Sequence, residues 1–280
     1  LVLGLTLSAV ALAESQVDNS APLTIAVAAN FSAPMKLLAS EFEQQTGRPV
    51  RLSIASSGKL FAQIQHGAPF DVFLSADQDK PQRLVEQGLA VSGSQFTYAV
   101  GELALWSSQQ HIDPEQTLRQ GNFRKLAIAN PKLAPYGLAA EQALVSLDLT
   151  EASKSKIIFG ESIGQAFQFV DSGSAELGFV ARAQVIAAGS SDSLSKGSVW
   201  FLPNNLYAPI RQDAVLLVRA KTDSGAGQFL EFLQSEYAKN TIQNFLGNSS
   251  ATVNIFPVFL ASDIFLNISR FSSSEYFFSI

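Results

Sequence analysis

Two junctions in the first quarter of the chain place small polar residues where an apolar run meets an amphipathic segment. The first is AANFS at 28–32, with Asn30 at its centre, and the second is ASSG at 55–58, which contains Ser57. Such side chains, together with the N–H groups and the positive dipole end of a helix, can hold an anion. Either junction taken alone is better explained by helix capping, because Ser and Asn are the commonest capping residues.

The residue types needed for catalysis or for a cation site are scarce. The chain has no cysteine, which excludes a thiol nucleophile, a cysteine–zinc site and a disulfide. His66 and His111, the two histidines, stand far apart and lack the spacing of metal ligands. Ser57 is not part of a G-x-S-x-G motif, and Asp77 is best explained as a helix cap. We therefore expect no enzyme activity, no cofactor and no free cation site.

The elements that must position the two junctions alternate between short apolar runs and segments of helical periodicity. Strands are predicted over 23–28, 50–55, 71–75, 97–106, 126–129, 177–181, 199–202 and 214–218. Helices are predicted over 32–46, 59–66, 78–87, 114–119, 138–147, 162–171 and 182–188, with one or two more in 224–245. This alternation predicts an α/β fold in which mainly parallel sheets are flanked by helices.

Length and charge narrow the classes further. The chain has 280 residues, 47% of them hydrophobic and 15% charged, with a formal net charge of −5. The length fits one large domain or two lobes, and the apolar content excludes a disordered chain. A net negative charge without a basic cluster argues against nucleic acid as a partner.

The two ends differ from the rest of the chain. Residues 1–13 form an apolar run that ends in Ala-Leu-Ala, which predicts a signal peptide and a mature chain starting near Glu14. The run opens on Leu1 without a basic segment, which indicates a clipped start. A membrane anchor is the alternative, but thirteen residues are too few to cross a bilayer, which takes about 20. Residues 246–280 are rich in Phe, Ile and Ser, and we interpret them as an atypical tail outside the fold.

Five segments together resemble a known family. They are AANFSAPM, SSGKLFAQIQHGAPFDVFLSAD, NPKLAPYGLAAEQAL, ESIGQAFQFVDSGSAELGFVA and YAPIRQDAVLL, in this order between about Leu23 and Phe245. They are similar to the periplasmic molybdate-binding proteins of ABC transporters. The resemblance implies a type II periplasmic-binding-protein fold, in which two lobes joined by crossover strands close around a tetrahedral oxyanion. Lobe 1 is then expected over 22–98 and 206–245, and lobe 2 over 99–205.

The resemblance also implies the residues that bind the anion. Matched one by one to the family's motifs, they are Asn30, Ser57 through its hydroxyl and its N–H, Tyr136, and the backbone N–H of Ile163. They would contact the metal centre only through the oxygen atoms of the anion. Ala181 stands where some members have a tyrosine, and we expect the Tyr136 hydroxyl to compensate. Ala29 stands where some relatives carry a hydroxyl, so one further donor is expected to be missing.

The function implied by the resemblance is that of a periplasmic receptor. It would capture molybdate, and tungstate as well, and deliver the anion as a monomer to an ABC permease in the membrane. A receptor for sulfate, phosphate or another small oxyanion is the alternative on the same fold. A sensor domain of a transcription regulator is a further alternative, which would require an attached helix-turn-helix.

Overall fold

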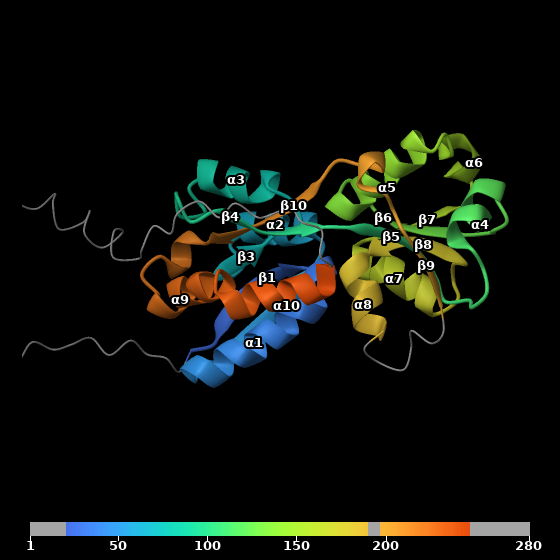
Figure 1. Cartoon of the computed structure of the whole chain (residues 1–280). Helices are drawn as coiled ribbons and strands as arrows, with labels where there is room; N and C mark the ends of the chain where they lie inside the picture. The colour runs from blue at the N-terminus through green and yellow to red at the C-terminus, as the bar shows by residue number, and fades with distance from the viewer. Residues whose placement is uncertain (1–20, 190–196, 247–280) are drawn as a thin grey trace, which may run out of the picture.

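Two five-stranded sheets lie side by side in two lobes, each flanked by helices (Figure 1). The computed structural model describes residues 21–189 and 197–246. The predicted signal peptide and residues 247–280 of the predicted tail lie outside the described residues. In the part that is described, no helix has the length and apolar character needed to cross a membrane.

The first sheet has the strand order β2-β1-β3-β10-β4. Strand β1 pairs in parallel with β2 and β3, whereas β10 is antiparallel to both of its neighbours. The strands are β1 (Leu23–Ala28), β2 (Val50–Ala55), β3 (Val72–Leu74), β4 (Phe96–Gly101) and β10 (Ile210–Leu216). The helices of this lobe are α1 (Ser32–Thr46), α2 (Ser57–Gln65), α3 (Asp79–Glu86), α9 (Ser224–Leu233) and α10 (Glu236–Leu246).

The second sheet repeats this plan with the order β7-β6-β8-β5-β9. Its strands are β5 (Leu103–Ser107), β6 (Leu126–Ala129), β7 (Ile157–Gly160), β8 (Leu177–Ala181) and β9 (Ser198–Phe201). Its helices are α4 (Pro114–Gln120), α5 (Pro135–Ser146), α6 (Thr150–Lys154), α7 (Ile163–Asp171) and α8 (Arg182–Gly189). In both sheets four strands run in the same direction, and one strand, β10 in the first sheet and β5 in the second, is antiparallel to its neighbours. The predicted α/β architecture with two lobes is confirmed.

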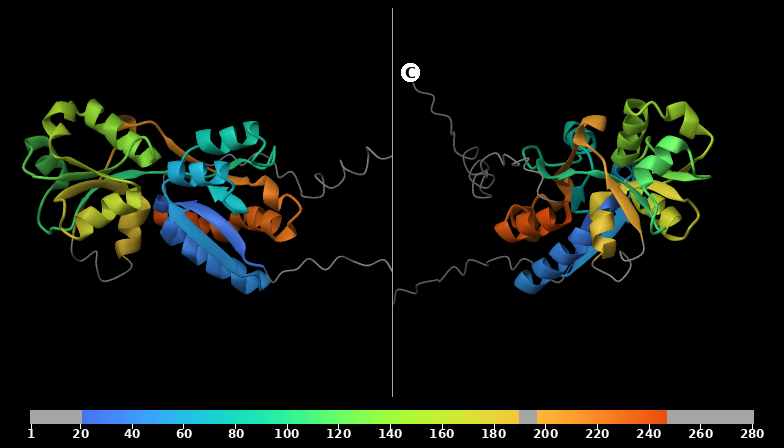
Figure 2. Two further views of the ribbon diagram at one scale, coloured as in Figure 1. Left: turned by 180° about the vertical axis from the view of Figure 1, so that it is seen from behind. Right: turned by 45° about the vertical axis from the view of Figure 1, so that its right-hand side comes forward.

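The chain passes between the lobes twice, from β4 to β5 and from β9 to β10 (Figures 1 and 2). A single strand was expected over 97–106, and this expectation is wrong. The run breaks at Glu102, so that β4 pairs with β10 in the first sheet and β5 pairs with β8 and β9 in the second. Both halves are largely buried, which makes the apolar run look continuous in the sequence.

Local sequence explains where several helices begin and end. Helix α1 covers the predicted residues 32–46 and ends at Gly47, whose φ of 72° is left-handed backbone that favours glycine. Helix α4 begins at Pro114 after Asp113, whose side chain accepts a hydrogen bond from the Gln116 N–H at 3.1 Å. Helix α5 begins at Pro135, three residues before its predicted start, because proline is favoured at the first helical position.

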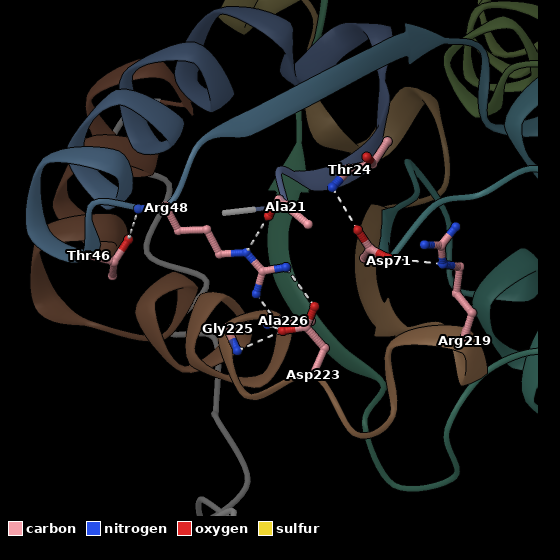
Figure 3. A network of polar contacts seen from close by, with 9 residues as sticks. All are labelled: Ala21, Thr24, Thr46, Arg48, Asp71, Arg219, Asp223, Gly225 and Ala226. Carbon is pink, nitrogen blue, oxygen red and sulfur yellow. Dashed lines mark hydrogen bonds and ion pairs between the residues drawn. The ribbon is translucent and has the colours of Figure 1, made fainter. Parts of the chain in front are cut away.

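A network of polar contacts holds the start of the first lobe (Figure 3). The buried Arg48 guanidinium donates to both carboxylate oxygens of Asp223 and, at 3.2 Å, to the Ala21 carbonyl. Asp223 also caps helix α9 by accepting from the Gly225 and Ala226 N–H groups at 2.9 and 3.2 Å. The network therefore ties the segment entering β1 to the N-terminus of α9. A Cβ on Gly225 would lie 2.0 Å from Arg48 Nη1, so this position requires glycine.

Helix α8 joins the cores of the two lobes. It follows β8 of the second sheet, yet it packs against α1 and α10 of the first lobe. Its Ala183 is buried in the same apolar cluster as Phe31, Met35 and Ile242. Small side chains on α8 allow this close approach.

Candidate functional site

The four predicted binding residues all lie at the N-termini of helices. Asn30 belongs to the short 3-10 helix η1 (Ala29–Phe31), which leads into α1. Ser57 and Ile163 are the first residues of α2 and α7, and Tyr136 is the second residue of α5. All four are at least 97% buried. Two of these helices belong to each lobe.

Direct contacts bring the four helix ends together where the lobes face each other. The Gly58 N–H of α2 donates to the Leu133 carbonyl, just before α5, at 2.8 Å. A Cβ built on Gly164 of α7 would lie 3.5 Å from the Cβ of Ala29 in η1. Gln212 of β10 contacts both Asn30 and Tyr136. The structure thus gathers all four predicted residues into one region between the lobes.

The four residues offer several hydrogen-bond donors, and none of the four has a charged side chain. The N–H groups of Ser57, Tyr136 and Ile163 lie in first helical turns, where no intrahelical acceptor exists. Within residues 21–189 and 197–246, no other protein acceptor contacts these three N–H groups. The Ser57 hydroxyl accepts from the Ala76 N–H at 2.9 Å, which leaves its own proton free to donate. Such a set of donors suits a small anion.

The Tyr136 hydroxyl lies on the side of the region formed by β4 and β10. It is 3.5 Å from Gln212 Nε2, and a Cβ on Gly101 would lie only 2.1 Å from it. Burial raises the pKa of Tyr136 far above its ordinary value, against the opposing effect of hydrogen bonds with Asn30 and Gln212. The phenol is therefore a neutral donor. That the Tyr136 hydroxyl compensates for the tyrosine that some family members have at the position of Ala181 stays a prediction.

Known proteins share both the sequence pattern and the fold. Residues 23–245 match the family described as bacterial extracellular solute-binding protein. The chain belongs to this family. A solute-binding protein releases its ligand unchanged, so this protein is a binding protein and not an enzyme.

Two relatives of this solute-binding protein are named molybdate-binding protein ModA. The one from Azotobacter vinelandii is 49% identical over 80% of this chain and 89% of its own length. The one from Rhodobacter capsulatus is 42% identical over 88% of this chain and 92% of its own length. The solved structure of the Azotobacter vinelandii periplasmic molybdate-binding protein superposes with a TM-score of 0.74, at 42% identity over 79% of this chain and 96% of that one.

A cleft between the lobes of this solute-binding protein lies beside three of these helix ends, those of η1, α2 and α7. Its volume is about 450 Å³, and it opens between α1, the β2–α2 junction and α7. Lys36 and Lys59 line one side, and Lys59 Nζ lies 3.7 Å from Glu161 Oε2 on the other. Ser56 also lines the cleft, and its buried hydroxyl has no hydrogen-bond partner among the residues that the structure describes.

Gln212 and Tyr98 are two residues near the site that the sequence did not single out. Gln212 is fully buried, and Tyr98 is 7% exposed. The predicted strand over 214–218 excluded Gln212, because Gln212 and Asp213 interrupt the apolar run. The one signal for Gln212 is its place in the polar pair Gln212-Asp213, which directly precedes the apolar run, because a polar pair within a buried strand must find hydrogen-bond partners.

Proposed function

We propose that this solute-binding protein captures molybdate, and also tungstate, between its two lobes and delivers it to an ABC permease. The observation that supports this most directly is a group of three N–H donors at helix N-termini, next to the Ser57 hydroxyl and the Asn30 amide, that have no acceptor in the described part of the chain. The proposed ligand residues are Asn30, Ser57, Tyr136 and Ile163. The names of the two ModA relatives favour molybdate as the anion.

The donors account for anion binding by a protein of net charge −5. A dianion transferred from water needs a hydrogen bond to each oxygen, or its desolvation opposes binding. Helix N-termini provide N–H groups whose partial positive charge favours the anion locally. A rigid ring of donors set for long metal–oxygen bonds also holds the shorter sulfate or phosphate less completely.

A receptor for sulfate or phosphate is the second candidate. A sulfate-binding protein from Mycobacterium tuberculosis has the same fold, with a TM-score of 0.68, but at 13% identity this likeness concerns the fold alone. Competition calorimetry with molybdate, tungstate, sulfate and phosphate separates the two candidates. Molybdate and tungstate should displace the others, and preferential binding of sulfate would contradict the proposal.

The Ser57 hydroxyl provides the first quantitative test. Replacing Ser57 by Ala removes a donor to the anion, so we expect molybdate affinity to fall by about 1.5–3 kcal/mol, or roughly ten- to a hundredfold. Ser172→Ala is the control, because this exposed hydroxyl at the C-terminal end of α7 does not line the cleft, and its affinity should stay close to wild type. Isothermal titration measures both. Equal affinities of the two variants would remove Ser57 from the site.

The cellular context of the proposal is the periplasm. We propose that residues 1–13 direct export and are removed, and that the mature receptor acts as a monomer without nucleic acid. The presence of the protein in a periplasmic fraction, with a mature N-terminus near Glu14 by mass spectrometry, tests this part. An uncleaved chain in the cytoplasm would contradict it.

A further inference from the structure

A buried polar network lies where the crossover strands pass between the lobes. Gln212 Oε1 accepts from Asn30 Nδ2 at 2.7 Å and from the Tyr98 hydroxyl at 3.1 Å, while its Nε2 faces the Tyr136 hydroxyl at 3.5 Å. The Tyr98 hydroxyl also lies 3.2 Å from the Ser75 carbonyl. Gln212 therefore touches two proposed ligand residues, one from each lobe, without being one of them.

A β-bulge creates this placement. The pairing of β10 with β4 shifts between Gln212 and Asp213, so that Gln212 faces Ala99 and Asp213 faces Thr97, with Tyr98 left over. A bulge re-aims side chains from the regular pleat. At this bulge, the Tyr98 hydroxyl contacts Gln212 next to the proposed binding site. Asp213 instead accepts from Thr97 Oγ1 at 2.6 Å and from Gln95 at 2.7 Å.

The last residue of the other crossover strand completes the enclosure. A Cβ on Gly101 would lie 2.7 Å from Gln212 Nε2, so the backbone of β4 comes close to the amide, whose orientation is set by its hydrogen bonds. The amide is thus held with its oxygen toward Asn30 and its N–H group toward Tyr136. An Asn30 Nδ2 that gives one proton to Gln212 keeps the second for another acceptor.

We propose that Gln212 is a positioning residue for anion binding, which orients the Asn30 amide and the Tyr136 hydroxyl toward the ligand from both lobes at once. The inference rests on the proposed function, because it concerns the same site. Its chemistry is specific: position 212 must accept on one side and donate on the other. Glutamine meets this requirement at every pH, whereas a carboxyl group meets it only when protonated.

Gln212→Glu therefore tests the inference, because a merely structural role of Gln212 would not make the molybdate affinity of this variant depend on pH. When the introduced carboxyl group is protonated, it accepts from Asn30 and donates to Tyr136, so affinity should lie within about threefold of wild type near pH 5.5. When ionised it can only accept, and its charge lies against the anion site, so affinity should be at least about tenfold weaker at pH 8. The surrounding ionisable groups are Tyr98 and Tyr136, whose pKa values burial raises, and Asp213, which faces the other way.

Two comparisons make the outcome decisive. The wild-type protein should bind molybdate with nearly constant affinity over this pH range, and Gln212→Leu should bind more weakly without a pH dependence. Calorimetry with sodium molybdate measures all three proteins, and melting without anion shows that each variant is folded. A flat pH profile for a folded Gln212→Glu overturns the inference. Absence of molybdate binding by the wild type overturns the proposed function instead.

Discussion

The Arg48–Asp223 pair joins an enclosed guanidinium to a carboxylate that solvent still reaches, with side chains 5% and 27% exposed. Asp223→Asn keeps a capping side chain at α9 but leaves the buried cation without its counter-charge, which should lower the free energy of unfolding by about 3 kcal/mol. Arg48→Met leaves only a carboxylate that water can hydrate, so its cost should be smaller, about 1–2 kcal/mol. Urea unfolding measures both, and a reversed order would contradict this reasoning.

The same pair predicts a pH dependence. The hydrogen bond from Arg48 holds the pKa of Asp223 below its usual value, so the ionised form is favoured in the folded protein. A lowered folded pKa adds stability above the unfolded value, about 3.9, and that stability is lost as pH falls through the folded pKa. The difference in unfolding free energy between wild type and Asp223→Asn should stay constant from neutral pH to about pH 4 and shrink below it. A constant difference down to about pH 2 would be incompatible with a lowered pKa.

At the residue scale, the site residues differ in how far the sequence predicts them. Asn30 and Ser57 stand out because each lies in a small polar run that directly follows an apolar run, a pattern that by itself predicts a helix cap or an anion site. Tyr136 and Ile163 became candidates only through the family resemblance, since a backbone N–H leaves no trace in residue type. Gln212 depends on a bulge between strands distant in sequence, which no local pattern reports.

At the scale of elements, α2 contacts the second lobe through backbone atoms. The Gly58 N–H donates to Leu133, and a Cβ on Gly58 would lie 2.9 Å from the Leu133 carbonyl oxygen. Gly58→Ala should therefore oppose approach of the lobes and weaken molybdate binding by about 1–3 kcal/mol, or roughly five- to 150-fold. Melting without anion should change little, because alanine also favours helix.

A second helical glycine supplies the control for this prediction. Gly227 in α9 has no atom within 4 Å of a built Cβ, so Gly227→Ala should raise the melting temperature and leave molybdate affinity unchanged. Titration calorimetry on both variants, with thermal melts, measures the contrast. Unchanged affinity for Gly58→Ala would show that the Gly58–Leu133 contact is not needed for binding.

Elements with strong periodicity or clear caps were predicted well, as α1 and β1 show. Helix α6 was missed because its five residues, TEASK, hold a single apolar side chain and show no helical periodicity. Strand β7 was missed as well, although it is as long as β6, which was predicted. The break at Glu102 was missed for a different reason. Nothing within the run 97–106 distinguishes a strand that leaves one sheet from a strand that continues in it, since tertiary pairing decides.

At the scale of the whole molecule, the alternation of strands and helices predicted an α/β fold, and the family resemblance implied its two lobes. The packing of α8 against α1 and α10 was not predictable, because the small residues of α8 are equally suited to any close helix contact. The crossovers were expected from the family resemblance alone, because no local pattern marks a strand that leaves one sheet for the other. Because of the crossovers, both lobes contribute to the site, η1 and α2 from the first lobe and α5 and α7 from the second.

The position of β10 in the first sheet has a consequence for the order of folding. This strand lies between β3 and β4, yet it follows the entire second lobe in the chain. Contacts between distant segments form slowly, because loop closure costs entropy before the contacts stabilise the fold. In refolding followed by pulsed hydrogen exchange, we therefore expect the amides of β6 and β8 to be protected before those of β4. Simultaneous protection would contradict this order. We therefore expect the second lobe to form first, and the ability to bind an anion to arise only when a late segment completes a sheet begun at the N-terminus.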